Sequence, residues 1–374
     1  MTKRVCLSMI VRNEEAVLPV TLQALLPYID SYSIVDTGST DNTVAVIEQY
    51  LGHLPGVVTP QEWSDFSTAR NLSLEIARQF GDYVFICDAD DVVEATVDGV
   101  EFRNQLVADA HNIVFRQGST LYHRPLLVRS TVTAMFRGVV HEFLAIEPTA
   151  RAGDYIEGFI INYNGAGTSY RNMDLTAKYA RDEELIQSAL LTCDDQALAS
   201  RYTFYLANSL QSAGRLTEAM QVFGDRTRQL AGYTQEVYIS FLRMGHLSRT
   251  QYSNPRMQLH MYMMAYEVDP TRAEAQFYIA ELARNQHWWN LAWLFVNDGL
   301  QRSVDPTKLF LESEIYNWRL RYEQSIAGWY TGQFEIGRTS CEWLLARSDL
   351  PEDIQEVTAK NLELYRSAKR CSPS

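Results

Sequence analysis

The chain has 374 residues, a formal net charge of -13 and five cysteines. Its length is sufficient for two domains, each able to bury a hydrophobic core of its own. The acidic charge argues against a protein that binds nucleic acid through the phosphates, since such binding needs clustered Lys and Arg, although a local basic groove would be compatible with it. The cysteines form no C-x-x-C pair and lie mostly in apolar runs, so we expect reduced thiols in a cytoplasmic protein.

The apolar stretch at residues 5–11 ends at the polar sequence Arg12-Asn13-Glu14-Glu15. It is predicted to be a strand and not a signal peptide. No other apolar run approaches the roughly 18 residues that a membrane-spanning helix requires. We therefore expect no transmembrane segment.

Short β-type runs alternate with helical periodicity in the first part of the chain. The runs cover residues 5–11, 33–37, 56–60 and 83–87. Such alternation predicts parallel β-α-β units. We expect Asn13 to cap one helix, Asp41 or Asn42 to cap the helix 43–50, and a further helix to cover residues 68–77.

Antiparallel signals replace this pattern beyond residue 110. Residues 112–116 and 121–129 are β-type segments joined by Gln117-Gly118-Ser119-Thr120, which predicts a hairpin. A last strand is expected over residues 155–163, and Gly165-Ala166-Gly167 marks the end of the domain. The sequence therefore predicts an α/β domain over residues 1–168.

An acidic cluster, Asp88-Ala89-Asp90-Asp91, follows directly on the apolar run 83–87. In open α/β sheets, ligands gather beyond the carboxyl ends of the strands. Asp88 and Asp90 are two residues apart, so an extended backbone would turn both toward a common side, where their oxygens suit Mg²⁺ or Mn²⁺. Taken alone, such a cluster could also be a solvated turn. Asp36, at the end of the run 33–37, supplies a second carboxylate at a strand end.

Four segments, in their order and spacing, resemble the nucleotide-diphospho-sugar glycosyltransferases of the GT-A fold, specifically the large inverting family 2. These segments are the first strand with Arg12-Asn13-Glu14-Glu15, residues 35–41, Ala69-Arg70-Asn71 and the acidic cluster, and the resemblance covers roughly residues 3–167. It implies a Rossmann-like nucleotide-sugar domain and a metal-dependent transfer from a UDP-sugar. Asp90 is expected to bind the Mn²⁺ or Mg²⁺ directly, Asp88 to reach the ribose or the metal, and Asp91 to contact the donor sugar or complete the coordination.

The same resemblance assigns residues to the uridine. Val11, Arg12 and Glu14 are expected around the base and ribose, and Asp36 at the uracil or ribose. Arg70 matches a family arginine near the nucleotide. From residue chemistry alone, Arg70 could instead form a salt bridge at a helix start, and Glu14 could complement a helix dipole at the surface.

An inverting transfer needs a general base that deprotonates the acceptor. Related family 2 enzymes with helical C-terminal repeats show a similar Gly-x-x-His-Glu segment, which here is Gly138-Val139-Val140-His141-Glu142. The resemblance implies that Glu142 is the base and that His141 ligates the metal or touches the pyrophosphate. Asp154 is a second candidate base, and a purely structural role for His141 and Glu142 stays open.

Amphipathic helical segments run from residue 172 to the C-terminus. Small residues recur at intervals of 7 and 12 in Ala207, Gly214 and Ala219 and in Ser325, Gly332 and Gly337, and at the interval of 12 in Ala280 and Ala292. Val268-Asp269-Pro270-Thr271 recurs 36 residues later as Val304-Asp305-Pro306-Thr307. Small residues at these spacings let antiparallel helices approach closely, which looks like tetratricopeptide (TPR) helix pairs. Residues 169–374 are therefore predicted to form an all-α, TPR-like domain.

These features predict a metal-dependent inverting glycosyltransferase with a helical repeat domain, similar to bacterial and phage family 2 enzymes that include peptide S-glycosyltransferases of bacteriocin clusters. Because helical repeats commonly bind peptides, we expect a protein or peptide acceptor, with a glycan or lipid-linked acceptor as the close alternative and modified DNA as a distant one. Exposed aromatic surface on the helical part could serve either as a homodimer interface or as an acceptor groove.

Two other function classes compete with this hypothesis. A nucleotidyltransferase shares the type of sheet and the metal carboxylates, but it normally has a glycine-rich, basic loop where this chain has Asn13-Glu14-Glu15. A non-catalytic scaffold would combine the helical repeats with a degenerate nucleotide-binding domain. The intact acidic cluster argues against the scaffold.

Overall fold

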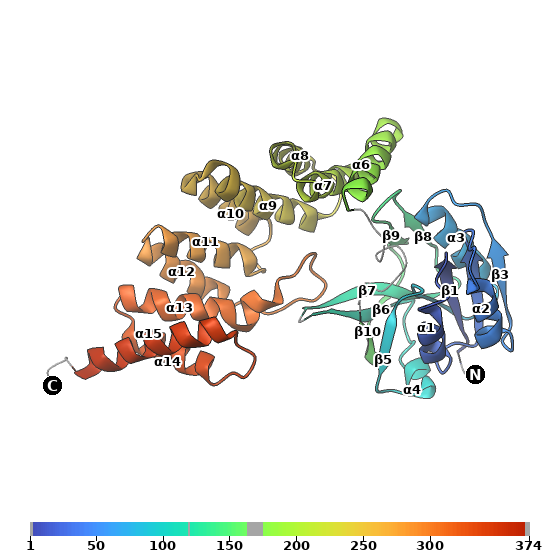
Figure 1. Cartoon of the computed structure of the whole chain (residues 1–374), viewed down its shortest axis with the longest axis horizontal. Coiled ribbons are helices and arrows are strands. Elements are labelled where there is room, and N and C mark those ends of the chain that lie inside the picture. Colours follow the sequence, from blue (N-terminus) through green and yellow to red (C-terminus); the bar gives the residue numbers. More distant parts are fainter. Residues whose placement is uncertain (1–2, 119, 163–174, 371–374) are drawn as a thin grey trace. The chain divides into compact units, whose positions relative to one another are not determined.

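The computed structural model describes residues 3–118, 120–162 and 175–370. The chain forms two compact units, Met1–Ser209 and Leu210–Ser374, and Figure 1 labels their elements. The predicted domain boundary at 168/169 and the segment Gly165-Ala166-Gly167 lie outside the described residues, so both stay predictions. The predicted fold class, an α/β domain followed by an all-α domain, is confirmed.

The N-terminal unit is built on one sheet of eight strands, in the order β3-β2-β1-β4-β7-β6-β10-β5. Four of these strands are mutually parallel and correspond to the four predicted runs: β1 (Val5–Val11), β2 (Ser31–Asp36), β3 (Gly56–Pro60) and β4 (Tyr83–Ile86). Nearly every side chain of β1, β2 and β4 is buried, because helices cover both faces of the parallel part of the sheet.

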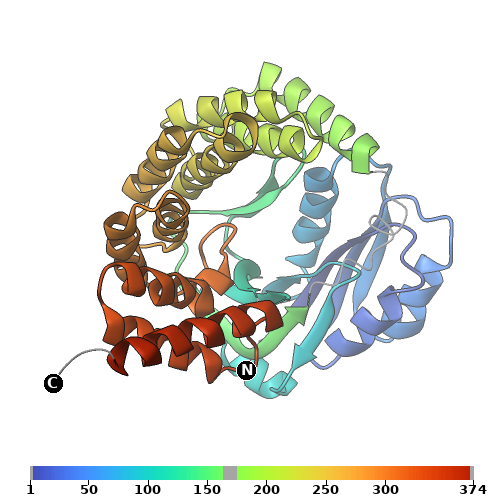
Figure 2. The same ribbon diagram turned by 60° about the vertical axis from the view of Figure 1, so that its left-hand side comes forward.

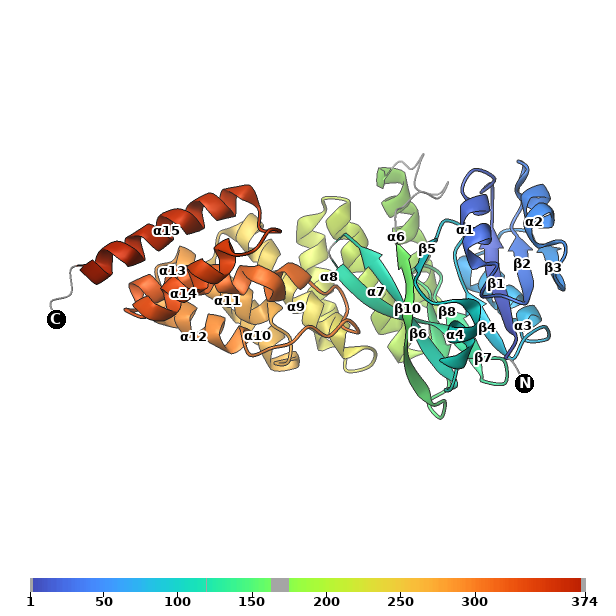
Figure 3. The same ribbon diagram turned by 90° about the horizontal axis from the view of Figure 1, so that it is seen from below.

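Three helices provide this cover. α1 (Leu18–Leu25) and α2 (Thr43–Leu51) contact each other on one face, and α3 (Phe66–Ala77) packs on β1 and β2 on the opposite face (Figure 3). The change of face follows from right-handed crossovers: the chain moves from β1 outward to β3 and then returns past β1 to form β4. α3 begins at its cap Asp65, whose carboxylate accepts a hydrogen bond from the Thr68 backbone N–H at 2.9 Å.

The remaining strands extend the sheet in mainly antiparallel fashion. The predicted hairpin is confirmed, because β6 and β7 pair antiparallel and β7 also pairs with β4. The sequence did not predict β5, β9 or α4. The elements of this half are β5 (Val92–Ala95), α4 (Gly99–Asn104), β6 (Ala110–Gln117), β7 (Thr120–Arg129), β10 (Ala152–Asn162) and a separate hairpin of β8 (Ala134–Arg137) and β9 (Phe143–Ile146). Helices α6 (Leu175–Thr192) and α7 (Gln196–Ser212) follow in the chain.

The C-terminal unit consists of helices joined mostly by short turns, with a longer connection over residues 300–314, and Figure 2 shows the helices following one another in a curved row. Consecutive helices contact each other as antiparallel neighbours, which is the arrangement that the TPR-like pattern predicts. The helices are α8 (Leu216–Arg228), α9 (Thr234–Tyr252), α10 (Pro255–Val268), α11 (Glu274–Asn285), α12 (Trp289–Gly299), the π-helical turn η1 (Ile315–Arg319), α13 (Leu320–Tyr330), α14 (Phe334–Leu345) and α15 (Glu352–Arg370).

The repeat intervals seen in the sequence have a backbone cause. Gly214, His287 and Gly332 each lie seven residues after a small residue of the pattern, and each occupies a turn between two helices with a positive φ of 78°, 58° and 73°, respectively. Residues other than glycine reach this left-handed region only at a cost of about 1–2 kcal/mol. The turn at His287 is therefore strained, whereas the turns at Gly214 and Gly332 are not.

We expect His287→Gly to raise the free energy of unfolding by about 1 kcal/mol and Gly332→Ala to lower it by a similar amount. Chemical denaturation monitored by circular dichroism would measure both changes. Gly224→Ala is a matched control in the interior of α8, where an added Cβ would meet only ordinary contacts at 3.6 and 3.7 Å. It should be stabilising, since alanine favours a helix, and equal effects at positions 224 and 332 would contradict the explanation.

A half-buried histidine with a shielded ring nitrogen makes the C-terminal unit sensitive to acid. The His246 ring in α9 packs edge to face against Tyr278 at 4.4 Å, and its Nε2 has no hydrogen-bond partner among the described residues. Burial lowers the pKa of His246 to about 4, and the charges of Arg243, Arg249 and Arg319 add to the shift. The fold therefore favours the neutral imidazole.

The stability that comes from this preference should be present above the unfolded pKa of about 6.5 and should be lost as the pH falls toward 4. Between pH 7 and pH 4, His246 should lower the free energy of unfolding of the wild type by on the order of 3 kcal/mol. We expect His246→Leu to remove this pH-dependent loss of stability. Urea unfolding of wild type and variant across this pH range measures the difference. The exposed His260 in α10 offers the control, and an equal flattening of the pH dependence by His260→Leu would disprove the assignment.

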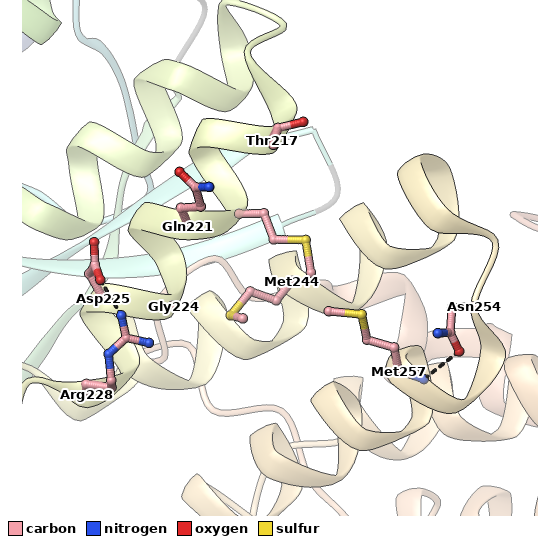
Figure 4. A pocket seen from close by; sticks show the side chains of 9 residues that line it. Thr217, Gln221, Gly224, Asp225, Arg228, Met244, Asn254 and Met257 are labelled. Carbon is pink, nitrogen blue, oxygen red and sulfur yellow. Dashed lines mark hydrogen bonds and ion pairs between the residues drawn. The ribbon is translucent and has the colours of Figure 1, made fainter.

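A groove of about 730 Å³ lies between α8, α9 and α10 (Figure 4). Methionine side chains form much of its wall, and the only ion pair among its lining residues is Asp225–Arg228. Thioethers are weak hydrogen-bond acceptors without acid or base function, so the groove offers no evident chemistry. Its lining consists of Thr217, Met220, Gln221, Gly224, Asp225, Arg228, Met244, Asn254 and Met257.

Candidate active site

The carboxyl ends of β1, β2 and β4 meet at one edge of the sheet. Val11 pairs with Asp36, and Ser8 pairs with Ile86, so the segments that follow these three strands leave the sheet as neighbours. The strand order also reverses between β1 and β4, and ligands of open α/β sheets bind at such a reversal. The predicted residues after β1, β2 and β4 are therefore brought to one place.

Asp36 is held in a tight turn after β2. Its carboxylate accepts hydrogen bonds from the Ser39 hydroxyl at 2.6 Å and from the Ser39 backbone N–H at 3.1 Å. The Ser39 hydroxyl oxygen in turn accepts from the Asn13 backbone N–H at 3.0 Å. The turns after β1 and β2 are thereby locked to each other, and Asp36 is 8 % exposed.

The prediction that Asn13 caps a helix is wrong. α1 begins only at Leu18, and Asn13 has a positive φ of 56°. Its side-chain oxygen accepts a hydrogen bond from the Thr40 backbone N–H at 2.7 Å. Asn13 therefore binds the turn after β2 and does not cap α1. At the second predicted cap, Asn42 precedes α2 and Asp41 accepts from the Thr43 N–H at 3.0 Å.

The other residues predicted around the uridine lie in the same turns. Val11 is buried, and its carbonyl accepts hydrogen bonds from the Thr37 N–H and hydroxyl. The Glu14 backbone N–H donates to the Thr43 hydroxyl at 2.8 Å. Arg12 is exposed. The structure thus brings Val11, Arg12, Glu14 and Asp36 together at the ends of β1 and β2.

The acidic cluster forms a closed turn after β4. The Thr21 hydroxyl contacts the carbonyls of Ala89 at 2.8 Å and Asp91 at 2.9 Å, and the Asp91 carboxylate accepts from the Asp88 backbone N–H at 2.8 Å. Burial raises the pKa of Asp91 to about 7, and the charge of Asp88 adds to the shift. Asp91 is thus the carboxylate that closes the turn from inside, whereas Asp88 and Asp90 are half-buried.

Arg70 connects this turn to the predicted base. Its Nη2 lies 2.7 Å from Asp88 Oδ1, and its Nε lies 2.9 Å from Glu142 Oε1. The Arg70 guanidinium also lies over the Phe136 ring, 5.4 Å from the centroid. Burial opposes ionisation of Asp88, but the positive charges of Arg70 and Arg124 lower its pKa. Three segments that are distant in sequence therefore meet at one guanidinium.

His141 and Glu142 occupy the turn between β8 and β9. The turn is tight, with positive φ at Gly138 (112°) and His141 (50°). The His141 ring stacks on Tyr205 of α7 with centroids 4.1 Å apart, while the residue as a whole remains exposed. Glu142 Oε1 is taken by Arg70, while Oε2 makes no hydrogen bond to the described residues.

The described part of the chain contains no group of three His, Cys, Asp or Glu side chains that could hold a metal ion. His141 is therefore not grouped with Asp88 and Asp90. However, Mg²⁺ at nucleotide sites is usually held by one or two carboxylates together with substrate phosphates. The half-buried carboxylates of Asp88 and Asp90 are hard oxygen donors and fit such an ion once a diphosphate supplies further ligands.

Arg124 is a site residue that sequence reasoning missed. β7 pairs with β4 through Phe85 and Leu127, and continuing this register by three residues brings Arg124 opposite Asp88. Its positive charge lowers the pKa of both Asp88 and Asp91. Arg124 is half-buried and lies over the Phe115 ring at 5.2 Å. The hairpin was predictable from sequence, but its pairing with β4, which places the arginine here, was not.

Asp154, the second candidate base, lies elsewhere on the sheet. It belongs to β10, and the strand order places β7 and β6 between β10 and β4. With neighbouring strands about 4.8 Å apart, the two backbones are separated by roughly 14 Å. The geometry thus brings Glu142, and not Asp154, to the acidic turn.

The family model described as "Glycosyl transferase family 2" matches residues 6–124. A TPR repeat-containing protein of Synechococcus elongatus is 37% identical over 106 residues, which are 28% of this chain and 24% of that protein. The chain thus spans about a quarter of the length of this curated relative.

Solved structures with similar folds are distant. S. aureus TarS is 14% identical with a TM-score of 0.39, covering 70% of this chain and 55% of TarS. TarS 1–349 in complex with UDP-GlcNAc is 13% identical with a TM-score of 0.37, covering 83% of this chain and 97% of that chain. Pseudomonas aeruginosa pilF is 14% identical with a TM-score of 0.38, covering 50% of this chain and 80% of that chain. Among the described helices, none is long and apolar enough to cross a membrane.

Proposed function

We propose, from the premise that residues 6–124 form a domain of glycosyl transferase family 2, that this protein transfers a sugar from a UDP-sugar to an acceptor with inversion at the anomeric carbon. The observation that carries the proposal is the Asp88–Arg70–Glu142 connection beyond the carboxyl end of β4. It links Glu142 to the acidic turn at the sheet edge where Val11 and Asp36 also lie, and this supports Glu142 as the base.

The donor would bind across the ends of β1, β2 and β4. The turns with Val11, Arg12, Glu14 and Asp36 would hold the uridine, and their mutual hydrogen bonds support a rigid, preformed cradle. Arg124 and Arg70 supply positive charge beside the acidic turn, where the diphosphate of the donor would lie. Guanidinium groups bind phosphate oxygens well and would stabilise the charge that develops on the leaving UDP.

Asp90, with Asp88, would hold Mn²⁺ or Mg²⁺ together with the diphosphate. The ion would supply Lewis-acid stabilisation of the leaving group. Asp91 would keep the turn in shape, because its carboxylate accepts the Asp88 N–H within the turn. Any role for it in contacting the donor sugar would require the turn to open.

Glu142 would act as the general base. Arg70 donates to its Oε1 at 2.9 Å and so fixes the position of the carboxyl group, while Oε2 would accept the proton from the acceptor as the acceptor atom bonds to the anomeric carbon and the bond to UDP breaks. The helical unit would present the acceptor. Its antiparallel helix pairs support a protein or peptide acceptor, with a glycan as the alternative.

The described cysteines support a reducing, cytoplasmic location. Cys6, Cys87, Cys193 and Cys341 are free thiols, and three of them are buried. Burial raises the pKa of Cys6 and Cys341 to about 11, so these thiols stay protonated and unreactive.

A thermal-shift screen of UDP, GDP and CDP with and without Mn²⁺ tests the proposal. A ligand that binds only the folded protein stabilises it by about 2.7 kcal/mol at a hundredfold excess over its Kd. We expect UDP with Mn²⁺ to stabilise the protein and Mn²⁺ alone to have little effect, because the described side chains offer no all-protein metal site. Stabilisation by Mn²⁺ alone would contradict the shared site, and no shift with any nucleotide would favour the non-catalytic scaffold.

A further inference from the structure

The start of helix α7 is tied to the end of strand β8. Asp195 caps α7, since its Oδ1 accepts a hydrogen bond from the Leu198 backbone N–H at 3.0 Å. Its other oxygen, Oδ2, accepts from Arg137 Nη2 at 2.8 Å. The Asp195 carboxylate therefore binds both the start of α7 and Arg137, which directly precedes the turn 138–142 that carries Glu142.

Arg201, in the second turn of α7, holds the middle of the same turn. Its Nη2 and Nε donate to the His141 carbonyl oxygen at 2.9 and 3.3 Å. The guanidinium carbon lies 4.6 Å from the centroid of the Phe143 ring and 4.8 Å from that of the Tyr205 ring. An arginine packed against two aromatic rings loses little further freedom when it donates, so the His141 carbonyl is held in one orientation.

Two tyrosines of α7 complete the contact. The Tyr202 hydroxyl accepts from the Val139 backbone N–H at 3.2 Å, and the Tyr205 ring stacks on His141 with an interplanar angle of 11°. The backbone of His141 is in the left-handed region, which residues other than glycine rarely adopt. The contacts from α7 compensate for this unfavourable conformation.

The position of Glu142 follows from the position of the His141 carbonyl. This carbonyl belongs to the peptide group that leads into Glu142, and the peptide group is planar and rigid. A rotation of this peptide group would change ψ of His141 and φ of Glu142, and so would reorient the Glu142 side chain relative to Arg70. No other side-chain hydrogen bond to the His141 carbonyl is recorded among the described residues.

We propose that α7 is a positioning element of the candidate active site, in which Arg201 and Tyr205 hold the turn 138–142 so that Glu142 faces the donor site. The inference rests on the proposed function. Neither side chain needs to touch the substrate, so their removal should affect the rate of transfer and leave donor binding intact. Positioning of this kind has a large effect on the reaction rate, because a misplacement of about 1 Å can lower the rate on the order of 100-fold.

Kinetics of UDP-sugar hydrolysis or transfer by the full chain test the inference. Arg201→Ala and Tyr205→Ala should each lower kcat by roughly 10- to 100-fold with a KM for the donor within about twofold of wild type. Arg201→Lys keeps one charged donor and should recover part of kcat. Arg228→Ala removes an exposed pair in α8 and should match wild type.

The outcomes separate the inference from the proposed function. If wild type turns over no UDP-sugar, the proposed function fails. If wild type is active and Arg201→Ala has the kcat of Arg228→Ala, only the positioning role is overturned. Stabilisation by UDP with Mn²⁺ is measured in parallel, and its loss in Arg201→Ala together with kcat would show general structural damage and also overturn the inference.

Discussion

Asp90→Asn is expected to reduce the turnover of UDP-sugar by about 1,000-fold or more. Asp90 lies in the turn after β4 with a half-buried carboxylate, at the position expected to hold the metal with the diphosphate. The amide has the same size but lacks the charge that a divalent ion requires. Since the fold of the turn depends on Asp91 and Thr21, the melting temperature of the free protein should change little.

A second readout makes the Asp90 prediction specific. The stabilisation by UDP with Mn²⁺ should largely vanish in Asp90→Asn, because the ion would lose its direct ligand. Asp82→Asn, at the opposite end of β4, alters an exposed carboxylate of the same strand and should leave both turnover and stabilisation unchanged. An active Asp90→Asn variant would rule out this residue as the metal ligand.

Arg70→Met should both destabilise the N-terminal unit and abolish most activity. The change would leave the carboxylates of Asp88 and Glu142 facing each other without the cation that now lies 2.7 and 2.9 Å from them. Breaking a buried ion pair from one side typically costs about 3–5 kcal/mol, which urea unfolding of the N-terminal unit would measure. The exposed pair Arg116–Glu94 is the matched control, and Arg116→Met should cost at most about 1 kcal/mol.

Arg70→Lys distinguishes charge from geometry at the same site. A lysine keeps the positive charge but is a point donor, which cannot hold two carboxylates with the planar fork of a guanidinium. We expect most of the stability to return while kcat remains well below that of wild type. Full recovery of kcat by lysine would mean that only the charge of Arg70 matters.

The sequence was informative where a residue's role depends on its own strand. The four parallel strands, the acidic cluster after β4 and Asp36 after β2 were all predicted, because buried strands have an unmistakable apolar pattern and their carboxyl ends converge in any parallel sheet. The helical pairs were also predicted, since small residues mark close helix contacts. His287 escaped the pattern because it replaces the expected glycine at a left-handed turn.

The missed features depend on contacts between distant segments. Arg124 enters the site only through the pairing of β7 with β4, and no local signal gives that register. Asn13 is a residue type that often caps helices, but here its backbone N–H donates to Ser39 and its side-chain oxygen accepts from Thr40. The bridge from Arg70 to Glu142 joins residues 72 positions apart. Such pairings are decided by the tertiary fold.

The shared guanidinium of Arg70 has a consequence for how this site can evolve. Asp88, Arg70 and Glu142 form a set in which one cation contacts two carboxylates, so replacing Arg70 leaves both carboxylates without it, whereas replacing one carboxylate leaves a 1:1 ion pair. Substitutions at these positions should therefore be correlated among relatives. A descendant that dispenses with catalysis and loses Arg70 would be expected to lose both carboxylates with it.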